Sequence, residues 1–383
     1  MSTLKITLQA GPHAMRWAPV SATVPVRIDA RHGVLADAST GARTPCQIEP
    51  AGGGARLTWL VAAAPSRTAL AYVLDTDAPA VPDAVALADD GAGRLDVAIG
   101  GQAFTTYNYG AQWARPFLYP VIGPHGKCIV RNWPMVEGVA GEVQDHLHHK
   151  GIWVAYGEVN GTDNWSEIGG HATVRHGRFA EVTSGPVFGR FRAVNDWLSR
   201  DGVKQVEELR EFTFYATPAG ERLADVSILF RATDGEVRFT DTKEGGILSV
   251  RVATSMDGDK GGTIVNAYGG TTEAETWGKP SPWVDYYGPL EGRVVGIAIL
   301  NHPASFRYPT RWHVRDYGLF TANPFALKHY EPERGWNGDH LLERGGELLF
   351  KYRLYIHDGR TDEANVRDKF LAYAQPPKIT VEA

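Results

Sequence analysis

The stretch that decides the fold runs from Lys351 to His357 and reads KYRLYIH. Polar and apolar side chains alternate along it, and a period of two is typical of a strand with one buried face. Three apolar side chains at every second position would share that face: Tyr352, Leu354 and Ile356. The same alternation recurs at 210–214 (REFTF) and at 226–230 (VSILF). These runs predict a protein built mainly from strands.

Turns and a single helix complete this reading of the chain. The 383 residues include 43 Gly and 23 Pro, which separate the alternating runs. Thr361 is a candidate N-cap for a helix near the C-terminus, where Val366, Phe370 and Leu371 would form an apolar stripe. Many strands and one late helix predict an all-β protein of the sandwich type.

Composition changes near residue 90. Only Trp17 and Trp59, of eleven tryptophans, precede this point, and residues 75–83 (DTDAPAVPD) have the composition of an exposed connection. A chain of 383 residues is also long for a single core. We therefore expect an accessory β-sandwich domain over residues 1–90 and a larger domain over residues 91–383.

Charge and apolar runs exclude several classes of protein. A net charge of -5 and a pI near 6.2 do not suit a nucleic-acid partner, which needs a basic surface. No stretch approaches the roughly 18 apolar residues of a membrane span, so no membrane partner is expected. The two cysteines, Cys46 and Cys128, are far apart and suggest no disulfide framework. With no signal-peptide pattern at the N-terminus, we predict a cytoplasmic protein.

Residues 145–153 read DHLHHKGIW and are the first candidate site. In an extended chain His146 and His148 would point to one side and could hold a divalent metal ion, while His149 would point to the other. The spacing of a cupin metal site is absent, because Gly151 to Trp153 stand where its Glu would lie. Alternatively, one imidazole acts as a general acid or base, and Asp145 or a backbone carbonyl orients another.

Two further stretches carry groups suited to sugar chemistry. In residues 239–246 (FTDTKEGG), Glu244 is a candidate catalytic carboxylate, or else half of a solvated ion pair with Lys243. Residues 309–325 mix Trp, His, Arg, Asp and Asn, which suits a polar pocket wall better than a core strand. Aromatic rings stack on sugar rings, and Arg, Asp and Asn bind their hydroxyls. The candidate substrate-binding residues are Arg115, Tyr119, Lys150, Trp153, Trp165, Glu167, Lys243, Arg315, Asp316 and Asn323.

Five stretches together resemble the bacterial PmoA-like family over roughly residues 90–358: RPFLYP (115–120), DHLHHKG (145–151), residues 157–165, KEG (243–245) and WHVRDYG (312–318). One departure is Leu147, where the resemblance leads us to expect Pro. The methane oxygenase label of that family belongs to an integral membrane protein, and no stretch here could span a bilayer.

The resemblance implies a large domain similar to the galactose-mutarotase-like supersandwich, in proteins associated with sugar catabolism and sugar oxidoreductases. Enzymes of that fold place His and Glu over a bound sugar, and the nearest matches by role are His148 or His149, His313 and Glu244. The main hypothesis is therefore an enzyme acting on a sugar or an oxidised (keto) glycoside by elimination, glycoside cleavage or epimerisation. The alternatives are a metal-dependent enzyme using His146 and His148, and a non-catalytic sugar-binding protein.

Overall fold

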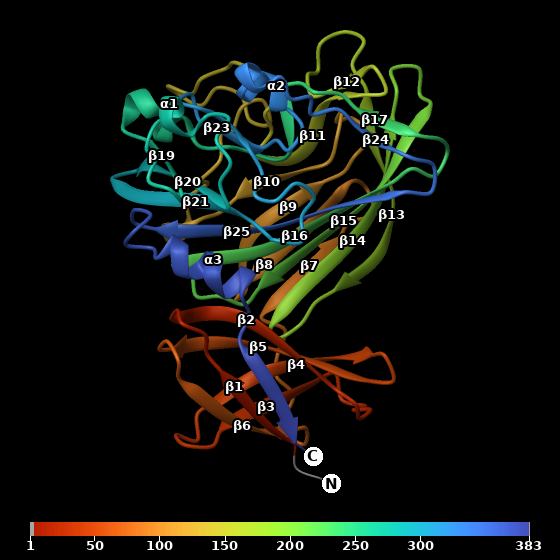
Figure 1. Cartoon of the computed structure of the whole chain (residues 1–383). Coiled ribbons are helices and arrows are strands. Elements are labelled where there is room, and N and C mark those ends of the chain that lie inside the picture. The colour runs from red at the N-terminus through yellow and green to blue at the C-terminus, as the bar shows by residue number, and fades with distance from the viewer. Residues whose placement is uncertain (1–3, 383) are drawn as a thin grey trace.

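The structure, a computed structural model, describes residues 4–382 and consists of three sheets with a few short helices (Figure 1). The prediction of an all-β protein with a helix near the C-terminus is confirmed. None of the helices in residues 4–382 combines the length and apolar composition that crossing a membrane requires. Cys46 and Cys128 are both free thiols, as their separation in the sequence predicts.

The first sheet has seven strands and forms the lower part of Figure 1. Its strands, in the order in which they pair, are β2 (Met15–Val24), β5 (Gly54–Ala64), β4 (Arg43–Ala51), β3 (His32–Asp37), β6 (Ala69–Asp75), β1 (Lys5–Gln9) and β26 (Lys378–Glu382). The sheet encloses its own core, in which Ile6, Leu8, Leu57 and Trp59 are fully buried.

The other two sheets share one large core and form the upper part of Figure 1. The 11-stranded sheet pairs in the order β22 (Trp312–Arg315), β23 (Leu319–Ala322), β18 (Gly245–Arg251), β11 (Ile152–Val159), β10 (Phe117–Val121), β9 (Gln102–Asn108), β8 (Arg94–Ile99) and β7 (Val85–Asp89). Beside this path lie β12 (Thr162–Asn164), β17 (Val237–Phe239) and β24 (His340–Leu342).

The 8-stranded sheet covers the other side of that core. Its order is β13 (Thr173–Thr183), β14 (Phe188–Leu198), β15 (Lys204–Tyr215), β16 (Glu221–Arg231), β25 (Glu347–Asp358), β21 (Arg293–Asn301), β20 (Trp283–Leu290) and β19 (Thr263–Asn266). The three alternating runs of the sequence lie within β15, β16 and β25, so these strand predictions are confirmed. Arg353 and His357, on the outer face of β25, are nevertheless only 5% and 1% exposed. Helix α3 and the first sheet cover that face (Figure 1).

The helix near the C-terminus begins later than the sequence predicts. α3 spans Val366–Ala374, with Asn365 as its N-cap, whereas Thr361 donates a hydrogen bond of 2.6 Å to Asp285. The prediction of Thr361 as the N-cap is wrong, because its hydroxyl donates to Asp285 on β20. Two further helices have four residues each: α1 (Glu273–Thr276) and α2 (Leu327–Tyr330).

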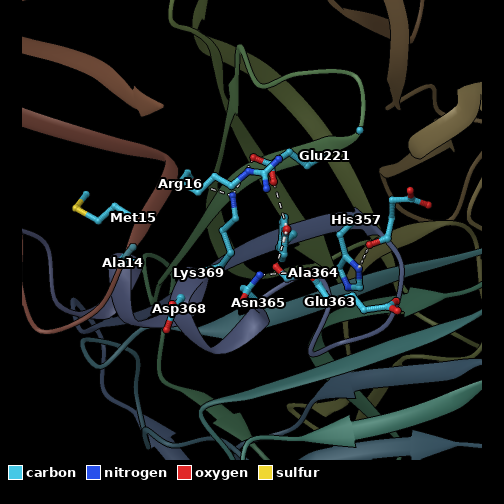
Figure 2. Close-up of a pocket in the computed structure, with 14 residues that line it drawn as sticks. Ala14, Met15, Arg16, Glu221, His357, Glu363, Ala364, Asn365, Asp368 and Lys369 are labelled. Carbon is cyan, nitrogen blue, oxygen red and sulfur yellow. Dashed lines mark hydrogen bonds and ion pairs between the residues drawn. The ribbon is translucent and has the colours of Figure 1, made fainter. Parts of the chain in front are cut away.

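A cavity of about 290 Å³ lies where α3 meets β2 and the ends of β16 and β25 (Figure 2). Lys369 crosses it and donates to Glu221 (2.9 Å) and to the carbonyl of Arg16 (2.8 Å). Tyr355 donates to Glu221 from the other side (3.2 Å). These contacts join the first sheet, α3 and the 8-stranded sheet.

The pairing of the strands does not divide the chain at residue 90. β7, at residues 85–89, pairs with β8 in the 11-stranded sheet, and β26, at residues 378–382, pairs with β1 in the first sheet. The connection at residues 76–84 carries no strand. The expected domains, 1–90 and 91–383, stay a prediction, and sheet membership changes between β6 and β7.

The outer face of the 11-stranded sheet carries the candidate site. One row of paired residues crosses five of its strands, and their side chains all point away from the main core: His313, Thr321, Ser249, Trp153 and Phe117. Neighbouring strands are about 4.8 Å apart, which places His313 and Trp153 about 14 Å from each other along this row.

Candidate functional site

Residues 145–151 form a tight turn instead of an extended strand. His146 has a φ of 45°, and the N–H of His149 donates to the carbonyl of His146 over 2.9 Å. The expectation that His146 and His149 point to opposite sides is therefore wrong. A left-handed residue reverses the chain, and the two rings lie parallel, 4.8 Å apart with 3° between their planes.

Four rings stack in this turn and on the sheet below it. The ring of His146 lies between those of Tyr317 and His149, and its centroid is 5.0 Å from that of Tyr317. His149 stacks on Trp153, with 5.2 Å between the ring centroids. Trp165 packs against His148 and His149, with ring centroids 5.5 Å and 5.3 Å apart. Trp153 and Trp165, expected to stack on a sugar, are 1% and 4% exposed and instead support the histidines.

Two buried arginines fix the turn from the side of the sheet. Arg131 donates to Asp145 (2.5 Å) and to the carbonyl of His146 (3.0 Å). Arg251 lies 3.0 Å from the same carboxylate, and its Nη1 is 3.1 Å from Nδ1 of His149. Burial alone would raise the pKa of Asp145, but the hydrogen bond from His146 and the arginine charges lower it. Asp145 therefore remains a carboxylate bound to two guanidinium groups.

Lys150, Arg115 and Glu167 form a second group next to the turn. Glu167 accepts from Arg115 over 3.0 Å and from Lys150 over 2.5 Å. All three side chains are at least nine-tenths buried, and the ammonium of Lys150 lies 5.8 Å from the ring centre of Trp113. The positive charges of Arg115 and Lys150 also act on His148. The structure thus places these three predicted residues next to the histidines. The three are paired with one another.

His313 and Glu244 form a third group, at the start of β18. Nδ1 of His313 lies 2.5 Å from the carbonyl oxygen of Lys243, and Lys243 pairs with Glu244 at the surface. Asn323 shapes this turn, because its amide donates to the carbonyls of Thr242 (3.0 Å) and Gly245 (2.9 Å). Its Oδ1 accepts from two backbone N–H groups, so Asn323 is engaged within the protein.

The remaining predicted residues lie at the margins. Arg315 donates to Glu273 over 2.7 Å, and Tyr119 donates to Asn132 over 2.9 Å. Asp316 is exposed, its backbone N–H donates to Glu273, and its Cβ lies beside Gly258.

Three histidines of this face have lowered pKa values. Burial, followed by nearby positive charges, lowers the pKa of His148 to about 3 and that of His313 to about 4. Burial also lowers the pKa of His149 well below its usual value. Each Nε2 atom is buried without a hydrogen-bond partner in the protein. Buried polar atoms are usually satisfied, so these three atoms lack the hydrogen-bond partner that such atoms normally have.

Glu244 differs from these histidines because it is accessible, with a side chain 49% exposed. Burial of its neighbourhood would raise its pKa, but the hydrogen bond from Lys243 and the charges of Lys243, His313 and Arg315 lower it. At neutral pH, this face therefore presents an ionised carboxylate and uncharged imidazoles.

A metal ion does not find a ready set of ligands here. Across the part of the chain that the structure describes, no group of three or more His, Cys, Asp or Glu side chains is arranged to hold one. Nδ1 of His146 is already paired with Asp145 at 3.0 Å, and the His146 and His148 rings are nearly perpendicular. The hypothesis that His146 and His148 bind a metal stays a prediction.

Sequence reasoning missed four residues of this face: Arg131, Arg251, Tyr317 and Tyr330. Arg251 is the last residue of β18, and its outward position could have been read from the alternation of that strand. Tyr317 lies within the WHVRDYG stretch, which drew attention to His313 and Arg315 instead. Tyr330 is 8% exposed with a buried, unpartnered hydroxyl, and the charges of Arg315 and Glu244 act on it. Nothing in its local sequence marks it.

Comparison with known proteins adds a family and two distant structural likenesses. A family of unknown function, DUF6807, matches residues 94–370. No curated protein matches the sequence. Over its whole length the chain is similar to a protein in glycosyl hydrolase family 38 from Enterococcus faecalis, with 10% identity and a TM-score of 0.44, and it covers 47% of that protein.

A second likeness covers 54% of this chain and 25% of a kojibiose phosphorylase candidate from the human microbiome, with 8% identity and a TM-score of 0.26. The chain thus spans less than half the length of either protein, and likeness at this level says nothing about ligands. None of these matches names the PmoA-like family, so that resemblance stays a prediction.

Proposed function

The chain belongs to DUF6807, a family of unknown function, and we propose that it is a carbohydrate-active enzyme. It performs acid–base chemistry on a sugar or on an oxidised (keto) glycoside. The observation that carries this proposal is the set of three buried, unpartnered Nε2 atoms on the outer face of the 11-stranded sheet, those of His148, His149 and His313.

Acid–base chemistry is favoured because the imidazoles are uncharged at neutral pH. A general base must have a free lone pair, and a lowered pKa keeps one available on a histidine. Glu244 adds an ionised carboxylate close enough to His313 for each group to influence the pKa of the other. Elimination, glycoside cleavage and epimerisation all require one group to accept a proton and another to stabilise charge on oxygen.

A carbohydrate is favoured by what surrounds these groups. Half-buried Trp113 and Tyr317 adjoin the cluster, and such rings pack against the C–H faces of sugars. Arg315 and Lys243 lie near Glu244 and can donate to hydroxyl or carbonyl oxygens. The resemblance of residues 90–358 to proteins associated with sugar catabolism points in the same direction.

The test uses 4-nitrophenyl glycosides and their keto-oxidised counterparts, with release of nitrophenol as the measurement. We expect turnover by the natural protein and at least a hundredfold loss in His313→Gln and in Glu244→Gln. His125→Gln is the matched control, because this surface histidine pairs only with Asp358. Full activity of both site variants would overturn the proposal. Sugar binding by calorimetry with no product after long incubation would show a binding protein instead.

A further inference from the structure

We propose that Arg251 is a positioning residue that holds His149 as its Nε2–H tautomer, so that His149 can only donate a hydrogen bond to a ligand. His313 is held in the opposite tautomer and can only accept one. This division of roles rests on the proposed function for its meaning in catalysis, but it can be measured without any substrate.

The first step is the contact between Arg251 and His149. Nη1 of Arg251 lies 3.1 Å from Nδ1 of His149, and both side chains are buried. A guanidinium group has five N–H donors, no acceptor, and stays protonated in proteins. Nδ1 of His149 must therefore accept, and the single ring proton of the neutral imidazole is on Nε2. That N–H is buried and has no partner in the protein.

The second step is that Arg251 cannot easily turn away. Its Nη2 lies 3.0 Å from Asp145, a carboxylate that also binds Arg131. On the other side, its guanidinium lies 4.9 Å from the ring centre of Tyr317. Arg251 is 0% exposed, so water does not compete for its donors. The guanidinium is thus fixed by one carboxylate, one aromatic ring and the imidazole.

The third step concerns His313, whose partner has the opposite chemistry. A backbone carbonyl can only accept, so Nδ1 of His313 donates its proton to the oxygen of Lys243, 2.5 Å away. Nε2 of His313 then carries the lone pair, and it too is buried without a partner. One ring is a fixed donor and the other a fixed acceptor, although both belong to the same residue type.

The two tautomers assign different work to the two rings. A neutral imidazole that gave up its Nε2 proton would become an anion, so His149 stabilises charge on a ligand oxygen without releasing that proton. His313 has the free lone pair and is the proton acceptor. The substrates of the site are tested separately, by the assay with nitrophenyl glycosides.

The test is long-range ¹H–¹⁵N correlation NMR of histidine-labelled protein at pH 7.5, with His149→Gln and His313→Gln used to assign signals. We expect the Nε2–H pattern for His149 and the Nδ1–H pattern for His313. Arg251→Lys keeps the His149 pattern because an ammonium also only donates. In Arg251→Met, which offers Nδ1 no donor, the Nδ1–H form appears beside the Nε2–H form.

The matched control is His125→Gln, a change at a surface histidine that leaves the partner of Nδ1 in place. An Nδ1–H signal for His149 in the natural protein would overturn the proposal, even if Arg251→Met fails to fold. An unchanged His149 pattern in folded Arg251→Met would also overturn it. If the tautomers are found as described but no glycoside is turned over, the proposed function fails and the positioning role of Arg251 stands.

Discussion

At the scale of single residues, Glu167 compensates two buried cations. Its carboxylate binds both Arg115 and Lys150, whose side chains are 2% and 5% exposed. Removing one partner of a buried ionic group leaves the rest without compensation and typically costs about 3–5 kcal/mol. We predict this loss in the free energy of unfolding of Glu167→Gln, measured by urea denaturation at pH 7.5.

Glu244→Gln provides the comparison for that prediction. The ion pair between Glu244 and Lys243 lies at the surface, and such pairs contribute about 0–1 kcal/mol. Similar losses in the free energy of unfolding of the two variants would show that burial does not increase the contribution of the Glu167 ion pairs to stability. A large loss of activity with little loss of stability in Glu244→Gln is the pattern expected for a residue of the site.

His313 gives the pH dependence of stability a definite direction. Its pKa is about 4 in the folded protein, below the usual 6.5, chiefly because burial opposes the charged form. Between these values the unfolded chain binds a proton and the folded protein does not, so its contribution falls as pH falls. From pH 7.5 to pH 5 the loss is about 2 kcal/mol for this residue.

Urea denaturation at these two pH values tests that sign. We expect His313→Gln to lose about 2 kcal/mol less than the natural protein between pH 7.5 and pH 5, because Gln does not titrate. His125→Gln, at the surface, should behave like the natural protein. An equal pH dependence in His313→Gln and the natural protein would contradict the lowered pKa.

At the scale of elements, β11 and β18 approach each other closely beside the candidate site. A Cβ at Gly157 would lie 2.3 Å from the carbonyl oxygen of Glu244, and one at Gly245 would lie 3.0 Å from Trp165. Gly157→Ala must therefore displace the 242–245 turn, with a loss of about 1–3 kcal/mol. We predict a lower Tm and an altered near-UV signal from tryptophan, whereas Gly169→Ala, which meets no atom within 4 Å, changes neither.

The elements also show how far sequence reasoning reaches. Alternation identified β15, β16 and β25, because a strand with one face on the core has a period of two. The turn at 145–151 was read as extended, since nothing in DHLHHKG announces the left-handed φ of His146. Choosing His148, His149 and His313 as candidate site residues needed only residue type. Their grouping depends on pairing between β22, β23, β18 and β11, which are distant in the sequence.

At the scale of the whole molecule, the first sheet docks on the 8-stranded sheet through an apolar cluster that includes Trp17 and Leu60, and through polar contacts beside it. Gln47 is 4% exposed, and its Oε1 accepts from the backbone N–H groups of Val187 (3.2 Å) and Phe188 (3.1 Å). Gln47→Ala would leave both donors buried without an acceptor, at about 1–3 kcal/mol each. We predict a lower midpoint in calorimetry and faster proteolysis within residues 76–84. An unchanged midpoint would show that the docking does not depend on Gln47.

The pairing of β26 with β1 joins residues 5–9 to residues 378–382. A ribosome releases the first of these segments hundreds of residues before the last. The first sheet therefore waits, with the edge of β1 uncovered, until residues 378–382 have been synthesised. A chain that stops before β26 keeps an open strand edge, which is a template for association with other chains. Prematurely terminated copies of this protein should for that reason be found among aggregated material and degraded early.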